Sequence, residues 1–349
     1  MSSFFFDALL WPAYHLWKAL QLPPPATPPS TPTDTSVSPC LDLFGHLAVI
    51  CGAIRAYLLA YMAIYWLSPR IQPLGIYPAF GGAHELSWTW TVPIMLRNVL
   101  ATWLICGSWD WFLYFSPLKS RLFPYKMNPT YPLLSQLQHD FCWTTCASLI
   151  ASLLEIAYCY CACNELFPSL PPQELVFSWE NIAWILLVTH WRLPHFYLTH
   201  RLMHPWKTAA SGGVLHYLPD IGRFLFKHVH SLHHKSQNPT AFSGTSMHPV
   251  EAFCYYSAAG VAVYGGRHCT VVLACVVDCA VGAWLGHDGF HFPGCGDEFH
   301  LLHHAHLDCN YGTSIDALDF WMGTSVSSKS DLARKRLSKS QKSTVKKDN

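Results

Sequence analysis

Charged residues are scarce in this 349-residue sequence, which contains 12% Asp, Glu, Lys and Arg against 51% hydrophobic and 15% aromatic residues. Because soluble domains carry about a quarter charged residues, the composition argues against a soluble protein and predicts a chain embedded in a membrane. The formal net charge of +1 gives no reason to expect nucleic acid as a partner. The few Lys and Arg residues serve instead as indicators of membrane topology.

Several motifs of metal and cofactor sites are missing. The fourteen cysteines include no CxxC pair and are scattered through apolar stretches, which favours small buried hydrophobes over a disulfide framework or a thiolate zinc site. The absence of HExxH disfavours a zinc metalloprotease. Neither a Rossmann glycine fingerprint nor a haem-binding CxxCH is present, so electrons for any redox reaction must come from a partner protein.

Four apolar segments predict membrane-spanning helices, because each is near the roughly 20 residues that a helix needs to cross a bilayer. They lie at 44–67, 91–115, 140–163 and 176–199 within a transmembrane region spanning residues 44–199. Charged residues inside such segments would be costly against lipid, so we expect them to face one another, the bundle interior or the interface. These residues are Arg55, Arg97, Asp110, Glu155 and Glu180.

The remaining segments flank or follow this region. Residues 1–43 form an N-terminal segment with a Pro-rich linker, and the polar, basic residues 325–349 form a tail that we expect to be disordered. Residues 200–324 contain most of the histidines and an apolar stretch at about 250–286 that glycines and an arginine interrupt near 265–267. Its halves are short for two crossings, so it predicts a shallow helical hairpin.

The distribution of basic residues predicts the topology. Lys119, Arg121 and Lys126 occupy the connection before the third segment, whereas residues 164–175 have no Lys or Arg. The positive-inside bias therefore places the N-terminus, and everything after the fourth crossing, in the cytosol. The chain ends KKDN, with Lys346 and Lys347 placed as in the dilysine retrieval signal of endoplasmic reticulum membrane proteins. We expect a multi-pass protein of that membrane, with its histidines on the cytosolic face.

Histidine is the unusual residue, since 17 of the 21 lie at or after His190. Three clusters recur: HRLMH at 200–204, HSLHH at 230–234 and HLLHH at 300–304. On a helix, offsets of three and four place side chains on one face, from which imidazoles can reach shared metal ions. Imidazole suits zinc, copper, iron and nickel. Eight ligands exceed the three or four of a zinc site and fit two metals of higher coordination.

These clusters and the motifs around them resemble the sterol desaturase and fatty acid hydroxylase superfamily of membrane di-iron enzymes, over residues 180–324. Beyond the three boxes, the similar elements are Pro239, Phe242, HPVE at 248–251, HDG at 287–289, NYG at 310–312 and the Asp319 to Gly323-Thr324 ending. The resemblance implies an all-α integral membrane fold of four spanning helices plus the hairpin, with a cytosolic histidine-rich helical cap that holds two metals.

The resemblance also implies a ligand set for two non-haem irons. The metal ligands expected from it are His200, His204, His230, His233, His234, His287, His300, His303 and His304. His248 is expected either to bind metal or to orient a ligand. His195 is an alternative member of the first box, His291 could bind from one turn beyond His287, and His228 and His306 are expected to orient ligands.

The implied reaction uses dioxygen to remove hydrogen from a lipid carbon, ending in a hydroxylation or a double bond. The implied partners are cytochrome b5 and its reductase, with NAD(P)H as the electron source. The HDG and HPVE elements look more like the sterol C-5 desaturase and C-4 methylsterol oxidase branch, so we expect a sterol substrate and a role in sterol biosynthesis. A fatty acyl or sphingolipid hydroxylase is the alternative enzyme, and a histidine-rich metal transporter is the alternative of another class.

Overall fold

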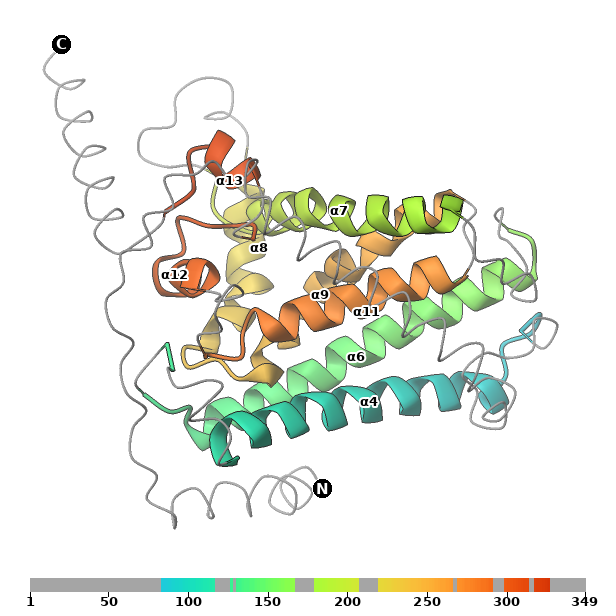
Figure 1. The fold of residues 1–349 in the computed structure, drawn as a ribbon, viewed down its shortest axis with the longest axis horizontal. Coiled ribbons are helices and arrows are strands. Elements are labelled where there is room, and N and C mark those ends of the chain that lie inside the picture. Colours follow the sequence, from blue (N-terminus) through green and yellow to red (C-terminus); the bar gives the residue numbers. More distant parts are fainter. Residues whose placement is uncertain are drawn as a thin grey trace, which may run out of the picture.

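The structure is a computed structural model that describes residues 83–116, 126–127, 130–166, 179–206, 219–265, 269–290, 298–313 and 317–326. The regular secondary structure in these ranges is helical, apart from one isolated antiparallel bridge between Lys126 and Phe290. Four long helices run alongside one another, with the shorter elements gathered mainly at one end (Figure 1). The long helices are α4 (Trp88–Phe115), α6 (Leu134–Cys163), α7 (Trp179–Leu202) and α11 (Cys269–Leu285).

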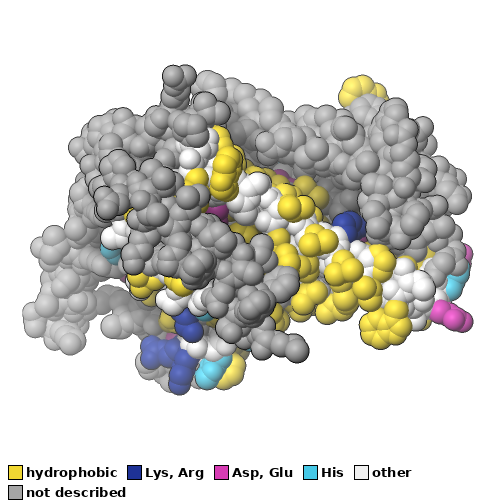
Figure 2. Space-filling model, turned by 90° about the horizontal axis from the view of Figure 1, so that it is seen from below, with side chains coloured by type: hydrophobic (Ala, Val, Ile, Leu, Met, Phe, Trp, Pro, Cys, Tyr) yellow, Lys and Arg dark blue, Asp and Glu magenta, His cyan; other side chains and the backbone are white. Residues whose placement is uncertain are grey.

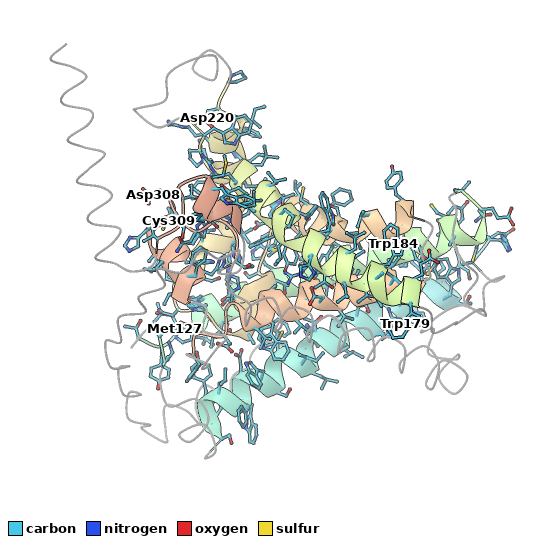
Figure 3. All side chains as sticks on the ribbon, turned by 45° about the horizontal axis from the view of Figure 1, so that its top comes forward. Met127, Trp179, Trp184, Asp220, Asp308 and Cys309 are labelled. Carbon is cyan, nitrogen blue, oxygen red and sulfur yellow. The ribbon has the colours of Figure 1, made fainter. Side chains whose placement is uncertain are left out.

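The shorter elements carry most of the sequence motifs. They are α8 (Ile221–His228), η5 (His230–Lys235), η6 (Ala241–Thr245), α9 (Pro249–Tyr256), η7 (Ser257–Ala259), α10 (Gly260–Tyr264), α12 (Glu298–His306) and α13 (Ala317–Trp321), where η marks a 3-10 helix. The start and the end of α7 lie in different parts of the molecule. Trp179 and Trp184 lie at its start, away from Asp220, Asp308 and Cys309 at the opposite end (Figure 3).

Two helices in the described ranges are long and apolar enough to cross a membrane, α4 and α6. They coincide with the predicted segments 91–115 and 140–163. The segment 176–199 is helical as predicted and forms most of α7, but it is not among the helices that meet this apolarity criterion. The segment 44–67 lies outside the described residues, as do residues 1–43 and 327–349. The predicted hairpin at 250–286 corresponds to α9, η7, α10 and α11.

An outer face of α4 is apolar and exposed, whereas α6 packs into the bundle. Leu96, Leu100, Leu104 and Trp111 are all exposed on α4. Hydrophobic side chains crowd the face of the molecule seen from below, along which α4 lies (Figure 2). Water would be a poor solvent for such a continuous surface, and lipid a good one.

Charged residues inside the apolar helices have polar partners, as expected from the cost of exposing them to lipid. Arg97 of α4 forms an ion pair with Glu155 of α6. Asp110 of α4 accepts a hydrogen bond from the backbone N–H of Ala241, at 2.8 Å. Arg55 lies outside the described residues. The expectation is confirmed for Arg97, Asp110 and Glu155.

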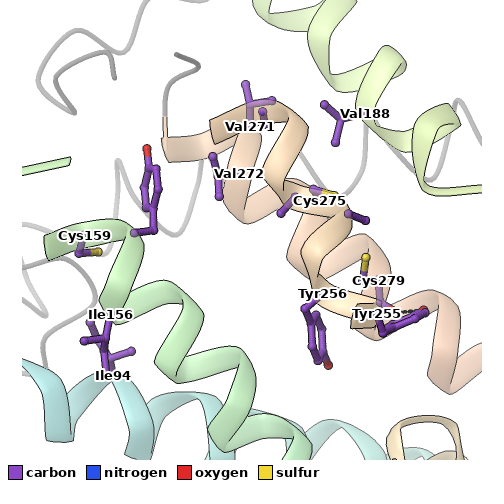
Figure 4. Close-up of a cluster of buried hydrophobic side chains, with 14 of the residues drawn as sticks. Ile94, Ile156, Cys159, Val188, Tyr255, Tyr256, Val271, Val272, Cys275 and Cys279 are labelled. Atoms are coloured by element: carbon purple, nitrogen blue, oxygen red, sulfur yellow. Dashed lines mark hydrogen bonds between the residues drawn. The ribbon is translucent and has the colours of Figure 1, made fainter. Parts of the chain in front are cut away.

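The main core lies between α4, α6, α7, α9 and α11 (Figure 4). Ile94, Ile156 and Val188 pack there with small residues such as Cys275 and Cys279. The ten described cysteines are free, and more than half of them are buried. Their interpretation as small hydrophobes is therefore confirmed for this part of the chain.

Candidate metal centre

Nine histidines meet at one end of the helix bundle in two groups. Within each group, one nitrogen from every imidazole lies within 4.8 Å of one from every other. The five-histidine group comprises His200, His204, His230, His234 and His303. The four-histidine group comprises His233, His287, His300 and His304. All nine are among the ligands expected from the sequence, whose spacing does not indicate how they divide.

The division follows the helical spacing within each cluster. Residues four apart share a group: His200 with His204 at the end of α7, His230 with His234 in η5, and His300 with His304 in α12. In each HxxHH cluster the remaining histidine joins the other group, so His233 and His303 cross over. Each of these two clusters therefore contributes to both groups and holds them side by side.

The proton positions of four imidazoles are set by backbone carbonyl acceptors at Nδ1. The carbonyl oxygens of Tyr311, Ser246, Ala283 and Cys309 can only accept hydrogen bonds, and each lies 2.5–3.2 Å from one histidine Nδ1. Those four histidines, His200, His233, His287 and His303, therefore carry their proton at Nδ1. Because a neutral imidazole has one proton, each Nε2 presents a bare lone pair.

The Nε2 atoms of each group point at one another. Those of His200 and His234 lie 3.0 and 2.9 Å from His230 Nε2, and those of His233 and His300 lie 3.2 and 3.0 Å from His287 Nε2. In the His200–His230 and His233–His287 pairs, where both Nδ1 atoms have hydrogen-bond acceptors, the Nε2 lone pairs face each other and repel, and a cation between them removes the repulsion. In addition, both ring nitrogens of buried His204 have no hydrogen-bond partner, which a metal ion would supply.

The spacing also bears on the coordination geometry. Two nitrogens bound at a right angle to a metal about 2.1 Å away lie about 3.0 Å apart, whereas a tetrahedral angle separates them by about 3.4 Å. Neighbouring Nε2 atoms lie 2.9–3.3 Å apart, which is compatible with both arrangements. The donor set therefore fits one metal ion in each group, with five imidazoles in one and four in the other.

Burial keeps the imidazoles neutral. Removal from water, followed by repulsion from neighbouring imidazoles, lowers the pKa of His200, His230 and His300 well below the usual range. Burial lowers the pKa of His287 to about 4 and that of His303 to about 3. The shift has the same direction at the other four histidines. Neutral imidazole is the form that binds metals, so the site is prepared for cations at neutral pH.

Glu251 orients the His230 ring through its Nδ1 atom, on the opposite side of the ring from Nε2. Its Oε1 accepts a hydrogen bond from His230 Nδ1 at 2.7 Å, and both side chains are buried. This is the carboxylate–histidine arrangement that fixes the ring orientation and raises ligand basicity in metal sites. Glu251 is the acid of the HPVE element, and its role was not predicted.

A loop after α12 shapes the five-histidine group. It supplies the carbonyls of Cys309 and Tyr311, which accept from His303 and His200. Buried Asp319 fixes this loop by accepting hydrogen bonds from the backbone N–H groups of Tyr311 and Gly312, at 3.0 and 2.6 Å. The NYG element and the Asp319 ending thus act together, although the sequence alone did not assign them this role.

A second polar network positions the segment after η5. Buried Asp140 of α6 accepts hydrogen bonds from Ser236 Oγ at 2.5 Å and Ser243 Oγ at 2.8 Å. Gly244 lies so close to α11 that an added Cβ would stand 2.2 Å from the carbonyl oxygen of Ala283. The network joins η5 and η6 to α6, and a buried acid in an apolar helix was the signal that could have located it.

The other histidines considered from the sequence lie elsewhere. His248 caps α9, where its Nδ1 accepts from the N–H of Val250, and belongs to neither group. The Nε2 atom of His195 lies 3.1 Å from Ser257 Oγ. His228 is exposed, and His306 is outside both groups. His291 lies outside the described residues.

A cavity of about 80 Å³ adjoins both groups, between α7, α9 and α11. His200 and His230 of one group, and His233, His287 and His300 of the other, line it. Its apolar walls come from Phe196, Met203, Met247, Tyr255 and Ala283. An apolar compartment beside clustered metal ligands is suited to a hydrocarbon group and excludes bulk water.

Comparison with known proteins identifies relatives of this region. Residues 184–324 match the fatty acid hydroxylase family model. Very-long-chain aldehyde decarbonylase GL1-8 of Oryza sativa subsp. indica is 26% identical over 142 residues, and GL1-11 of Oryza sativa subsp. japonica is 27% identical over 143 residues. Each match covers 37% of this chain and 47% of the relative, so the chain spans about half the length of these curated relatives.

No solved structure matches the chain. The family match contains all three histidine clusters and agrees with the similarity predicted over residues 180–324. Over these residues, the chain is similar to the sterol desaturase and fatty acid hydroxylase superfamily.

Proposed function

We propose that this protein is a membrane-bound non-haem di-iron oxidoreductase that uses dioxygen to hydroxylate or desaturate a lipid. The observation that carries the proposal is the convergence of nine neutral imidazoles into adjacent groups of five and four. Two redox-active irons would supply the oxidation of an unactivated C–H bond, which zinc lacks the redox chemistry to perform.

The chain's own residues would set the geometry of the reaction. Glu251 and the loop carbonyls hold ring orientations, so ligands need little rearrangement when metal binds. Phe196 contacts the rings of His200 and His300, with centroids 5.1 and 6.2 Å apart, and forms part of the apolar wall. A lipid lying along that wall would bring one carbon to the histidine groups while water is excluded.

A sterol is the proposed substrate, supported by the likeness of the HPVE and HDG elements to the sterol-oxidising branch. A fatty acyl chain or sphingolipid is the second candidate, favoured by the family match and by relatives named very-long-chain aldehyde decarbonylases. For either substrate we propose an endoplasmic reticulum location, cytosolic histidine groups, and electrons delivered from NAD(P)H through cytochrome b5 and its reductase.

The test is a sterol and fatty acyl profile of cells that express wild type, His233→Ala or His228→Ala. His233 belongs to the four-histidine group, whereas His228 is exposed and outside both groups, so it is the matched control. We expect a new lipid product with wild type and His228→Ala, and none with His233→Ala. If neither lipid pool changes while cellular metal content does, the oxidoreductase proposal fails and metal transport replaces it.

A further inference from the structure

An arginine lies in the wall of the apolar cavity beside the histidine groups. Arg192 of α7 lines the same cavity as His200, which follows it by about 12 Å along the helix axis. A guanidinium in apolar surroundings is costly unless its charge is compensated and its N–H groups have partners. Here the charge of Arg192 is compensated, whereas only one of its guanidinium nitrogens has a hydrogen bond to another described residue.

The charge of Arg192 is compensated by Asp278 of α11. Arg192 Nε donates to Asp278 Oδ2 at 2.6 Å, and the two side chains are only 11% and 14% exposed. Nε is the sole guanidinium nitrogen with a hydrogen bond to another described residue. The two terminal nitrogens, which carry four of the five N–H donors, therefore remain for a ligand in the cavity.

Gly282 lies against the guanidinium. A Cβ at this position would stand 3.2 Å from Nη1 of Arg192, tighter than ordinary van der Waals contact, and 3.4 Å from Nη2, in contact with it. Gly282 also lines the cavity. A larger residue would press on both terminal nitrogens, so glycine leaves them accessible from the cavity side.

We infer that Arg192, held by Asp278, binds a neutral hydroxyl or carbonyl oxygen of the lipid substrate and so determines which lipids enter. The inference rests on the proposed function for its substrate, a lipid oxidised at the histidine groups. A neutral oxygen fits better than a carboxylate because Asp278 already compensates the guanidinium. A second carboxylate would introduce an uncompensated negative charge into an apolar cavity.

The test compares wild type with an Arg192→Leu/Asp278→Leu double variant in lipid nanodiscs. Removing both partners avoids the buried unpaired aspartate that Arg192→Leu alone would leave. Radiolabelled octadecanol is the probe, and unlabelled octadecanol, octadecane and stearate compete with it. We expect wild type to bind octadecanol about 10- to 100-fold more tightly than octadecane, since a hydrogen bond to a charged donor is worth that ratio. In the double variant we expect this preference to disappear while octadecane affinity and metal content stay unchanged.

Arg192→Lys provides a third measurement, because it keeps the charge but loses the planar fork. We expect it to retain part of the preference for octadecanol. A double variant that keeps the full preference would show that the ion pair is purely structural and overturn the inference. Tighter binding of stearate than of octadecanol would overturn the assignment of a neutral oxygen. Because these are binding measurements, a wild-type preference without any lipid oxidation would leave the inference standing and reject the proposed function.

Discussion

Replacing Glu251 should weaken one metal site and spare the other. Glu251 contacts His230 of the five-histidine group through a buried 2.7 Å hydrogen bond, and no hydrogen bond in the described residues joins it to the four-histidine group. Loss of such orienting carboxylates lowers metal affinity about 10- to 100-fold. Glu251→Leu should therefore lower the affinity of the five-histidine site by about that factor.

The assay is a titration of metal-free protein with ferrous iron against a competing chelator, under anaerobic conditions, fitted to two sites. Glu251→Gln keeps an acceptor oxygen but no charge, so we expect a smaller loss than for Glu251→Leu. Glu85→Gln, at an exposed position, is the control and should match wild type. Equal weakening of both sites, or no change at either, would refute the assignment of Glu251 to His230.

Three further predictions test the packing and the charge state of the same region. In the metal-free protein, burial lowers the histidine pKa values, so the unfolded chain binds more protons than the folded one below about pH 6.5. The unfolding free energy should therefore be unaffected above that pH and decrease as the pH falls toward about 4 and 3, the pKa values of His287 and His303. The slope should be about 1.4 kcal/mol per pH unit for each additional proton taken up on unfolding, measured by denaturant titration at several pH values, and a flat profile would contradict it. Gly244→Ala should lower the unfolding free energy by about 1–3 kcal/mol through its clash with α11, whereas Gly260→Ala, with nothing within 4 Å, should leave thermal stability unchanged or slightly raised. Asp319→Ala should release the loop behind the five-histidine group and reduce both thermal stability and iron retention, and unchanged iron retention would separate that loop from the site.

The ligand residues could be predicted because their chemistry is local in the sequence. Offsets of four within a helical turn bring His200 to His204 and His300 to His304 whatever the rest of the fold. The helical character of 91–115 and 140–163 followed similarly from long apolar runs. His248 was ambiguous because a histidine before proline can equally cap a helix, and in the structure it caps α9.

The distribution of ligands between the two groups could not be predicted from spacing. It depends on how η5, α11 and α12 meet, which is set by long-range contacts such as those of Asp140 with Ser236 and Ser243. The roles of Glu251 and Asp319 depend on the same contacts, since neither is adjacent in sequence to the histidine it supports. The helix α7 illustrates a further limit: its residues overlap the predicted segment 176–199, but its polar side chains keep it from meeting the apolarity criterion for a membrane span.

The most direct test of the two-metal account is the iron content of purified protein, measured by inductively coupled plasma mass spectrometry on three proteins. Wild type is compared with His200→Ala/His204→Ala, which removes two ligands from the five-histidine group, and with His300→Ala/His304→Ala, which removes two from the four-histidine group. The account predicts about two irons per wild-type chain and about one in each double variant. A wild type with a single iron, or the loss of all iron from both variants, would contradict two separately held metals.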